Sequence, residues 1–307
     1  MKTTEIDKLV LVREQNERGV APDTGKMMPH FQRCGFPLQR PPVGYLKHER
    51  RDGDMKITIE ADSKFGMPFG ADVLTLLWCF TTALDQKSRT IKFKAAAQIL
   101  RDMDLPPQTG NYRAVVQSIQ RIFGCKYTFE WADVVPGKGK RKHIVQALLF
   151  ERLSLWFHEN NDQMPLEGEG FENEIELSDF AWKWIHRTKW LATAPAYALR
   201  QAPGAIQLYL VIASRGPRLR GPGDLCEIPL TGPDGLDQQI GGRTYEGKKG
   251  QDRWRQLLKK WMGQIKVGWP ECPVELVNLT GCTRGGVPKH GWYLRIGWFP
   301  QPGQDPT

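Results

Sequence analysis

Apolar residues recur at helical spacing in the stretch QDRWRQLLKKWMGQIK, residues 251–266. They follow one another at offsets typical of one face of a helix with about 3.6 residues per turn. The pattern therefore predicts an amphipathic helix whose apolar face is buried. The apolar positions are Trp254, Leu257, Leu258, Trp261, Met262 and Ile265.

The opposite side of this predicted helix is basic. Between residues 248 and 266 the sequence has seven Lys or Arg residues against one Asp. Such a face favours a polyanion as partner, although an ordinary solvated helix rich in lysine has the same pattern. The polar residues of this face and its flanks are Arg253, Arg255, Gln256, Lys259 and Lys260.

An earlier part of the chain predicts a series of short elements, separated by turn signals such as LPPQTGN. The first helix is apolar over most of its surface, which indicates a central position. The predicted elements are a helix at 71–84, a strand at 88–93, helices at 94–102 and 112–123, a strand at 125–131, a basic turn at 134–142 and a strand at 143–157.

This order of helix, strand, two helices and hairpin is that of a winged helix, a helix-turn-helix variant. In such a fold the third helix can reach base edges in the major groove, and the hairpin, or wing, can reach a phosphate strand. A lysine-rich turn that is merely solvated would look the same as a wing. The candidate residues are Arg113, Gln117 and Arg121 on the helix, and Lys138, Lys140, Arg141 and Lys142 in the hairpin.

The second half of the chain repeats this order. We therefore predict an α+β fold with two tandem winged-helix domains, at 56–190 and 191–307, after a partly ordered N-terminal arm at 1–55. The predicted elements of the second half are a helix at 203–214, a strand at 226–230, a short helix at 234–240, a glycine-rich turn at 241–250, the helix at 251–266, and strands at 274–279 and 292–298 joined by a loop at 280–291.

The remaining segments have weaker patterns. The arm is expected to hold at most one short helix, near residues 6–18, and a polar turn at 48–54. Residues 161–174 are acidic and rich in turn formers, which predicts a surface loop. Ser178 is a plausible helix N-cap. The tryptophans that follow, Trp182, Trp184 and Trp190, are expected to pack in the core or between domains rather than to stack on bases.

Charge and composition narrow the choice of partner. The net charge of +9 and the pI of about 9.2 favour nucleic acid or an anionic surface. No apolar run approaches the ~20 residues that span a bilayer, and the N-terminus has no hydrophobic signal core. Six cysteines form no CxxC pair and have no zinc-ligand spacing. We expect a cytoplasmic protein without membrane association.

Motifs of catalysis are missing from the sequence. None of the six histidines lies two positions from another, so the metal-binding histidine cluster of rolling-circle nucleases is missing. The sequence has no GxxxxGK[ST] phosphate loop, no GxSxG and no HExxH. We therefore expect no enzymatic activity, no metal and no cofactor.

Three stretches resemble the plasmid replication initiator proteins of the RepA type, between about residues 65 and 298. MPFGADVLTLLWCFTTALDQKSRTIKF is similar to the opening helix of that family. NEIELSDFAWKWI and APGAIQLYLVIASR resemble its next strand and two helices. DGLDQQIG, DRWRQLLKKWMGQIKVGWPECPVELV and GWYLRI resemble its closing segment. These motifs are patterns of apolar spacing, and the chain departs from them at Gln207, where the family often has an acidic residue.

The resemblance implies a protein that binds repeated sites in double-stranded origin DNA, opens the origin and recruits the host helicase and initiator proteins. It also implies homodimers that repress their own promoter and monomers that initiate replication. The DNA contacts that it implies are those of the matching helix faces: Arg253, Arg255, Gln256, Lys259 and Lys260 in the second domain, and Arg113, Gln117 and Arg121 in the first.

Two alternatives remain open on the sequence. The first is a winged-helix transcriptional repressor with no initiator activity. The second, more remote, is a nuclease or primase with an unrecognised motif. An initiator would make supercoiled origin DNA reactive to a single-strand probe, whereas a repressor would only protect its site.

Overall fold

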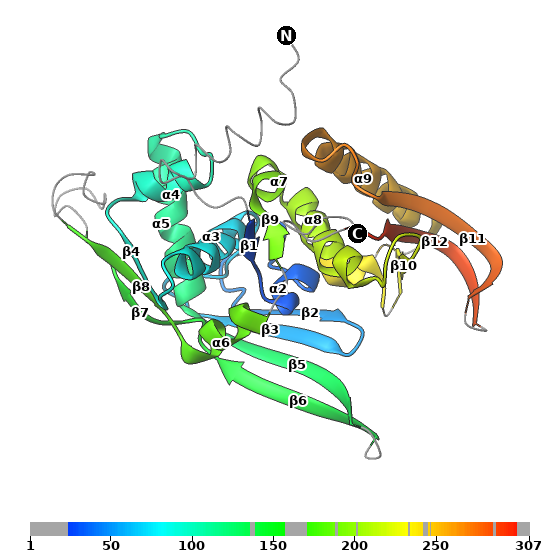
Figure 1. Cartoon of the computed structure of the whole chain (residues 1–307), viewed down its shortest axis with the longest axis horizontal. Coiled ribbons are helices and arrows are strands. Elements are labelled where there is room, and N and C mark those ends of the chain that lie inside the picture. Colours follow the sequence, from blue (N-terminus) through cyan, green and yellow to red (C-terminus); the bar gives the residue numbers. More distant parts are fainter. Residues whose placement is uncertain are drawn as a thin grey trace, which may run out of the picture.

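The computed structural model describes residues 24–135, 139–156, 171–187, 190–200, 202–232, 234–241, 245, 247–284 and 287–299. Within these residues the strands form four antiparallel sheets. Figure 1 shows the helices of residues 72–123 on the left, and the helix and strands of residues 247–297 on the right.

The first winged-helix unit consists of three helices and a three-stranded sheet. The strand that follows its first helix lies at one edge of the sheet, and the order is β4-β8-β7. The first helix is buried almost all round, as its apolar sequence predicts. The elements of this unit are α3 (Asp72–Asp85), β4 (Thr90–Phe93), α4 (Ala96–Asp102), α5 (Thr109–Phe123), β7 (Phe150–Ser154) and β8 (Asn173–Leu177).

The second winged-helix unit has the same arrangement. Its sheet has the order β10-β12-β11, again with the strand that follows the first helix paired to the last strand. The prediction of an α+β fold with two tandem winged helices is therefore confirmed. The elements of this unit are α8 (Pro203–Arg215), η1 (Gly216–Arg218), β10 (Leu225–Pro229), η2 (Asp237–Gly241), α9 (Gly247–Gly268), β11 (Val274–Arg284) and β12 (Val287–Gly297).

The basic hairpin of the first unit forms where the sequence predicts it, but it is not the wing. Its strands, β5 (Cys125–Val135) and β6 (Gly139–Ala147), belong to a separate sheet of order β2-β3-β5-β6. The wing is instead the β7–β8 hairpin, because β8 pairs with β4 and β7 pairs with β8. In Figure 1 the β5–β6 hairpin leaves the body at the bottom of the view, away from α4 and the upper part of α5.

Three further elements differ from the prediction. The polar segment predicted as a turn is strand β2 (Lys47–Asp52), which pairs with β3 (Met55–Ala61). The strand predicted at 143–157 is two strands, because the chain leaves β6 and joins another sheet at β7. The loop predicted at 280–291 is mostly strand, since β11 and β12 stay paired out to Arg284 and Val287.

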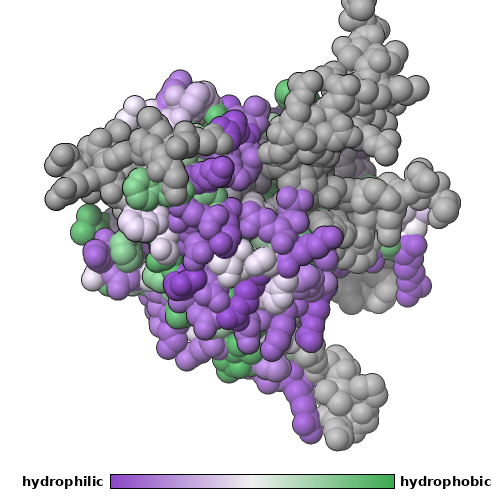
Figure 2. All heavy atoms as spheres, turned by 60° about the vertical axis from the view of Figure 1, so that its left-hand side comes forward, coloured by the Kyte–Doolittle hydropathy of each residue, from purple (hydrophilic) through white to green (hydrophobic). Residues whose placement is uncertain are grey.

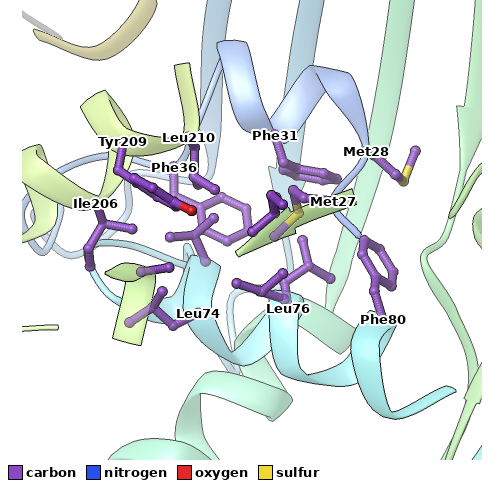
Figure 3. Packing of buried hydrophobic residues seen from close by; sticks show 14 of the residues in the cluster. Met27, Met28, Phe31, Phe36, Leu74, Leu76, Phe80, Ile206, Tyr209 and Leu210 are labelled. Atoms are coloured by element: carbon purple, nitrogen blue, oxygen red, sulfur yellow. The ribbon is translucent and has the colours of Figure 1, made fainter. Parts of the chain in front are cut away.

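The N-terminal segment is part of the core. Strand β1 (Thr24–Lys26) pairs with β9 (Trp190–Ala192), and α2 (Pro29–Arg33) packs against α8. Figure 3 shows side chains of this segment between those of α3 and α8. The segment therefore joins the two units. The predicted boundaries at residues 55 and 190 stay a prediction, and the predicted helix near 6–18 lies outside the described residues. The buried residues of the segment include Met27, Met28, Phe31, Cys34 and Phe36.

Two helices complete the fold. Helix α6 (Asp179–Arg187) begins after Ser178, whose Oγ accepts a hydrogen bond from the N–H of Ala181 at 3.2 Å, so the predicted N-cap is confirmed. Helix α7 (Thr193–Ala198) leads into α8. Trp184 packs in an edge-on contact with Trp131 of the basic hairpin, at 5.3 Å between ring centroids. The packing role predicted for Trp184 is confirmed, whereas the side chain of Trp190 lies outside the described part.

The departure at Gln207 has a structural reason. Its side chain is buried, and its Nε2 donates to the backbone oxygens of Phe31 and Gln32 at 3.1 Å each. Gly35 leaves room for the other end of the amide, because a Cβ there would lie 1.7 Å from the Gln207 Oε1. An acidic residue at this position would place acceptors against two carbonyl oxygens. The amide therefore ties α2 to α8 in this chain.

We expect Gln207→Glu to destabilise the protein by about 1–3 kcal/mol at neutral pH, because two hydrogen bonds are lost and a carboxylate is buried without a donor. Urea denaturation would measure the change. The loss should shrink at low pH, where the introduced carboxyl group is protonated and regains one donor. Gln207→Met, which removes the amide without adding charge, is the matched control and should lose less. Equal losses in both variants at every pH would contradict this role.

The basic hairpin is held to α2 and α6 by an aromatic cluster around His30. The His30 ring lies 4.9 Å from Phe129, 5.6 Å from Trp131 and 5.8 Å from Trp184, all in edge-on contacts. Burial is the largest cause that lowers the pKa of His30, to about 4, and the nearby Arg33 adds to it. His30 is therefore neutral in the folded protein at neutral pH.

The folded state should lose stability as the pH falls from about 6.5 towards 4. In this window the unfolded chain binds a proton at His30 and the folded chain does not, so stability is full above the unfolded pKa and is lost below it. We expect about 2 kcal/mol between pH 7.5 and pH 5 from this group. Denaturation at several pH values would show a smaller loss in His30→Phe than in the parent. The exposed His290→Phe should behave like the parent; identical profiles for all three would count against the assignment.

Candidate nucleic-acid interface

The buried side of α9 is fixed by three aromatic rings. The Trp254 Nε1 donates to the backbone oxygen of Leu230 at 2.9 Å, and its ring stacks on Tyr245 at 4.7 Å. Trp261 meets Trp254 edge-on at 5.5 Å and lies so close to α8 that a Cβ at Gly204 would be 1.9 Å from its ring. Both tryptophans are buried, as predicted. The helix is thus held in one rotation about its axis.

This rotation exposes one row of polar side chains along α9. The exposed residues follow at steps of three and four, so they share a face. The predicted residues Arg253, Gln256, Lys259 and Lys260 are all in this row. The sequence missed its last member, Lys266, because it lies at the end of the predicted helix. The row combines one amide, which can read a base edge, with cations that can meet phosphates.

Arg255 lies beside this row, but its side chain makes contacts within the protein. It pairs with Asp252 one turn earlier, and its guanidinium lies 4.4 Å from the ring centroid of Trp292 on β12. Its side chain is 26% exposed. The cation–π contact connects α9 to the wing of the second unit. We assign Arg255 to positioning the helix against that wing, and its predicted DNA contact stays a prediction.

Helix α5 presents a shorter polar face. Its buried side carries Val115, Ile119 and Ile122, whereas Arg113 and Gln117 are exposed and one helical turn apart. An exposed arginine and amide at this spacing have the chemistry that reads guanine and adenine edges. The face is less basic than that of α9. The structure therefore brings together two of the three residues predicted on this helix.

The third predicted residue, Arg121, has its side chain packed against other residues of the protein and not exposed to solvent. Its Nε and Nη2 donate to the two oxygens of Asp72 at 2.8 Å each, and its guanidinium lies 4.8 Å from the ring centroid of Phe69. Its side chain is 14% exposed. Such a two-pronged pair binds α5 to the start of α3. A helical wheel places Arg121 on the polar face, but it does not show that Asp72 lies within reach.

The β5–β6 hairpin carries a second group of cations. Arg141 and Lys142 are exposed, and Lys142 pairs with Glu130 on the neighbouring strand. Trp131 in the middle of the hairpin stacks on its cross-strand partner His143, at 4.5 Å between ring centroids. Of the other predicted residues, Lys138 lies outside the described residues, as does the side chain of Lys140. The hairpin is therefore a firmly anchored strand pair with a basic end.

The wing of the first unit is acidic. Between residues 150 and 179, which include β7 and β8, the sequence has nine acidic residues and one arginine. In the described part of the wing, Glu174 and Glu176 are both paired with Arg152. Figure 2, with the side of the first unit turned forward, shows a largely hydrophilic surface with small, separate hydrophobic groups. This wing is unsuited to a phosphate strand, so the β5–β6 hairpin is the better candidate.

Other kinds of site find no support in the described residues. They contain no group of three or more His, Cys, Asp or Glu that could hold a metal ion. The helices of this part are all too short or too polar to cross a membrane. Cys79 and Cys125 are buried.

No family model and no curated protein sequence matches the chain. Among solved structures, the chain resembles two crystal structures of domains 2 and 3 of RctB. One has a TM-score of 0.53 and 13% identity, over 88% of this chain and 98% of the RctB chain. The other has a TM-score of 0.51 and 15% identity, over 88% and 97%. A weaker likeness, with a TM-score of 0.45 and 10% identity over 74% and 88%, is to a crystal structure of Pi initiator protein in complex with iteron DNA. The RctB likeness covers both winged-helix units and shows the fold.

Proposed function

We propose that this chain is a sequence-specific duplex-DNA-binding protein that initiates plasmid replication. The observation that carries the proposal is the pair of exposed polar helix faces, on α5 and on α9, at the same position of two winged-helix units in one chain. Two such units give one chain two recognition helices, α5 and α9. The basic net charge and the resemblance to RepA-type initiators support the same function.

Each candidate residue has a separate role in this proposal. Arg113, Gln117 and Gln256 face base edges, because they can form paired hydrogen bonds there. Arg253, Lys259, Lys260 and Lys266 face phosphates beside α9. Arg141 and Lys142, with Lys138 and Lys140, supply phosphate contacts near the first unit in place of the acidic wing. Arg121 and Arg255 hold the reading helices in position.

Origin opening is the step that separates initiation from repression. We propose that binding at repeated origin sites destabilises a neighbouring A·T-rich tract, and that the host helicase and initiator proteins then join the complex. Dimers of the chain would bind its own promoter. These steps rest on the family resemblance, and the DNA-binding faces are common to an initiator and a repressor.

Permanganate reactivity on supercoiled DNA tests this proposal. The plasmid carries an array of bound sites beside an A·T-rich tract, and a relaxed plasmid is the control. An initiator should make thymines in the tract reactive only on the supercoiled plasmid. Protection of the sites with an unreactive tract would indicate a repressor. Nicking that depends on magnesium would contradict both and indicate a nuclease.

Gln256 should determine the preferred base at one position of the DNA site. An amide on the exposed face of α9 can pair with adenine through two hydrogen bonds, which is worth about 1–3 kcal/mol of discrimination. We expect Gln256→Ala to relax preference at one base pair while the salt dependence of binding stays unchanged. Competition binding with single-substituted duplexes would measure this. A uniform loss of affinity for all duplexes would place Gln256 on a phosphate instead.

A further inference from the structure

Four arginines from four elements meet where the N-terminal segment, the β2–β3 sheet and the second unit come together. Arg33 ends α2, Arg50 lies in β2, Arg215 ends α8, and Arg218 ends η1. The first three lie near the buried Cys34, and Arg33 and Arg215 lie near Arg218. We call this group the arginine cluster.

One carboxylate, Asp52, lies inside the cluster. The Arg215 Nη2 donates to both oxygens of Asp52 at 2.8 Å and to the Gln239 Oε1 at 3.3 Å. Arg33 pairs with the same carboxylate. Asp52 is 5% exposed, so these ion pairs are largely shielded from water. Asp52 thus pairs with two of the four arginines, Arg33 and Arg215.

The remaining donors of the cluster are not filled. The Nε atoms of Arg33, Arg50 and Arg215 are buried and have no hydrogen-bond partner within the described chain. The guanidinium of Arg50 has one long contact, 3.4 Å to the backbone oxygen of Glu49. Among the described residues, the side chain of Arg218 has no ion pair or hydrogen bond. The cluster therefore combines an excess of positive charge with free donors.

Two of the four arginines have a lowered pKa. Burial lowers the pKa of Arg218, and the charges of Arg33 and Arg215 lower it further. Burial likewise lowers the pKa of Arg50. Cations that are partly shielded from water and outnumber their counterions are unfavourable, and a protein retains them at a cost in stability. An anion of matching shape would remove this cost.

We propose that the arginine cluster binds a small phosphate-type oxyanion at the junction of the two units. Planar guanidinium groups bind phosphoryl oxygens through paired hydrogen bonds. The free Nε atoms are buried, which excludes the backbone of a rigid duplex as their ligand. Arg218 is exposed to solvent, unlike the Nε atoms of the other three arginines. Because its ligands come from both sides of the junction, the anion would stabilise the contact between the units.

Thermal denaturation of the full chain with pyrophosphate, without DNA, tests the proposal. Sodium chloride at equal ionic strength is the reference. We expect a saturable rise in Tm for the parent and a loss of affinity of about tenfold or more in Arg218→Ala, because one charge-assisted contact is removed. The matched control is Arg220→Ala, which removes an exposed arginine two residues away and should respond like the parent.

Arg218→Ala should also be at least as stable as the parent when no anion is present, because it relieves repulsion. This second readout separates a lost ligand from a damaged fold, and Arg218→Lys should restore part of the response. A rise in Tm that does not saturate, or that is equal in both alanine variants, would overturn the proposal. So would a lack of response to pyrophosphate together with a salt slope of duplex binding that falls by about one unit in Arg218→Ala, since the ligand would then be a DNA phosphate.

Discussion

Replacing Trp261 with alanine is expected to destabilise the second unit by about 3–5 kcal/mol, the range for deleting a large buried aromatic side chain. Trp261 is 7% exposed, and its ring fills the space left by Gly204 on α8. The same ring supports Trp254, which is bonded to the chain just after β10. The deletion would therefore leave a cavity at the contact that sets the rotation of α9.

Urea denaturation followed by tryptophan fluorescence would measure this loss. Trp156→Ala is the matched control, because Trp156 is 50% exposed and its removal should cost little. DNA binding by Trp261→Ala should fall in parallel with the folded fraction of the second unit. A stable variant that has lost DNA binding would mean that Trp261 touches DNA and that the burial of this face is not what holds α9.

Replacing Lys259 and Lys260 together with glutamine should reduce affinity for duplex DNA roughly 30-fold near physiological salt, if both neutralise phosphates. The reason is counterion release, which contributes about 0.9 to the slope of log K against log salt for each phosphate contact. The slope should therefore fall by about 2, and the parent and the variant should have similar affinities for duplex DNA near 1 M salt. Both lysines are exposed, so the fold should be unaffected.

Titrations at several salt concentrations would give both quantities. The matched control is the double change Lys87→Gln and Lys183→Gln, which removes two exposed lysines that lie on neither reading helix. The control should keep the parent slope. An unchanged slope in the Lys259 and Lys260 variant, or an equal fall in the control, would show that α9 does not lie along a phosphate strand.

The helices of both units could be predicted from the sequence because their buried residues recur at helical spacing. The buried positions Trp254, Leu258, Trp261 and Ile265 of α9 follow directly from spacing, and so does the exposed row on its other side. Helical periodicity is local, so one stretch of sequence is enough to reveal it.

Strand pairing could not be predicted in the same way, because it depends on distant partners. Strand β4 pairs with β8, some eighty residues later, and not with the basic hairpin that follows α5. The sequence pattern therefore assigns the wing to the wrong hairpin. Strand β2 was missed because KHERRD has no apolar alternation: the residues that it buries are His48 and Asp52, which hold polar contacts in the core.

The contacts of single arginines could not be predicted from the sequence, for a related reason. A helical wheel separates a polar from an apolar face, but it does not show which polar side chains find a partner on another element. Asp72 lies 49 positions from Arg121, and Trp292 lies 37 positions after Arg255. The same applies to the arginine cluster, whose members are scattered from Arg33 to Arg218.

Selection of bound sequences from random duplex DNA tests most directly whether α5 and α9 are two recognition helices on one chain. We expect two half-sites about one helical turn apart, or a multiple of it. Selection with Gln117→Ala should alter one half-site, and selection with Gln256→Ala should alter the other. A single enriched half-site, or two variants that change the same base pairs, would contradict the claim.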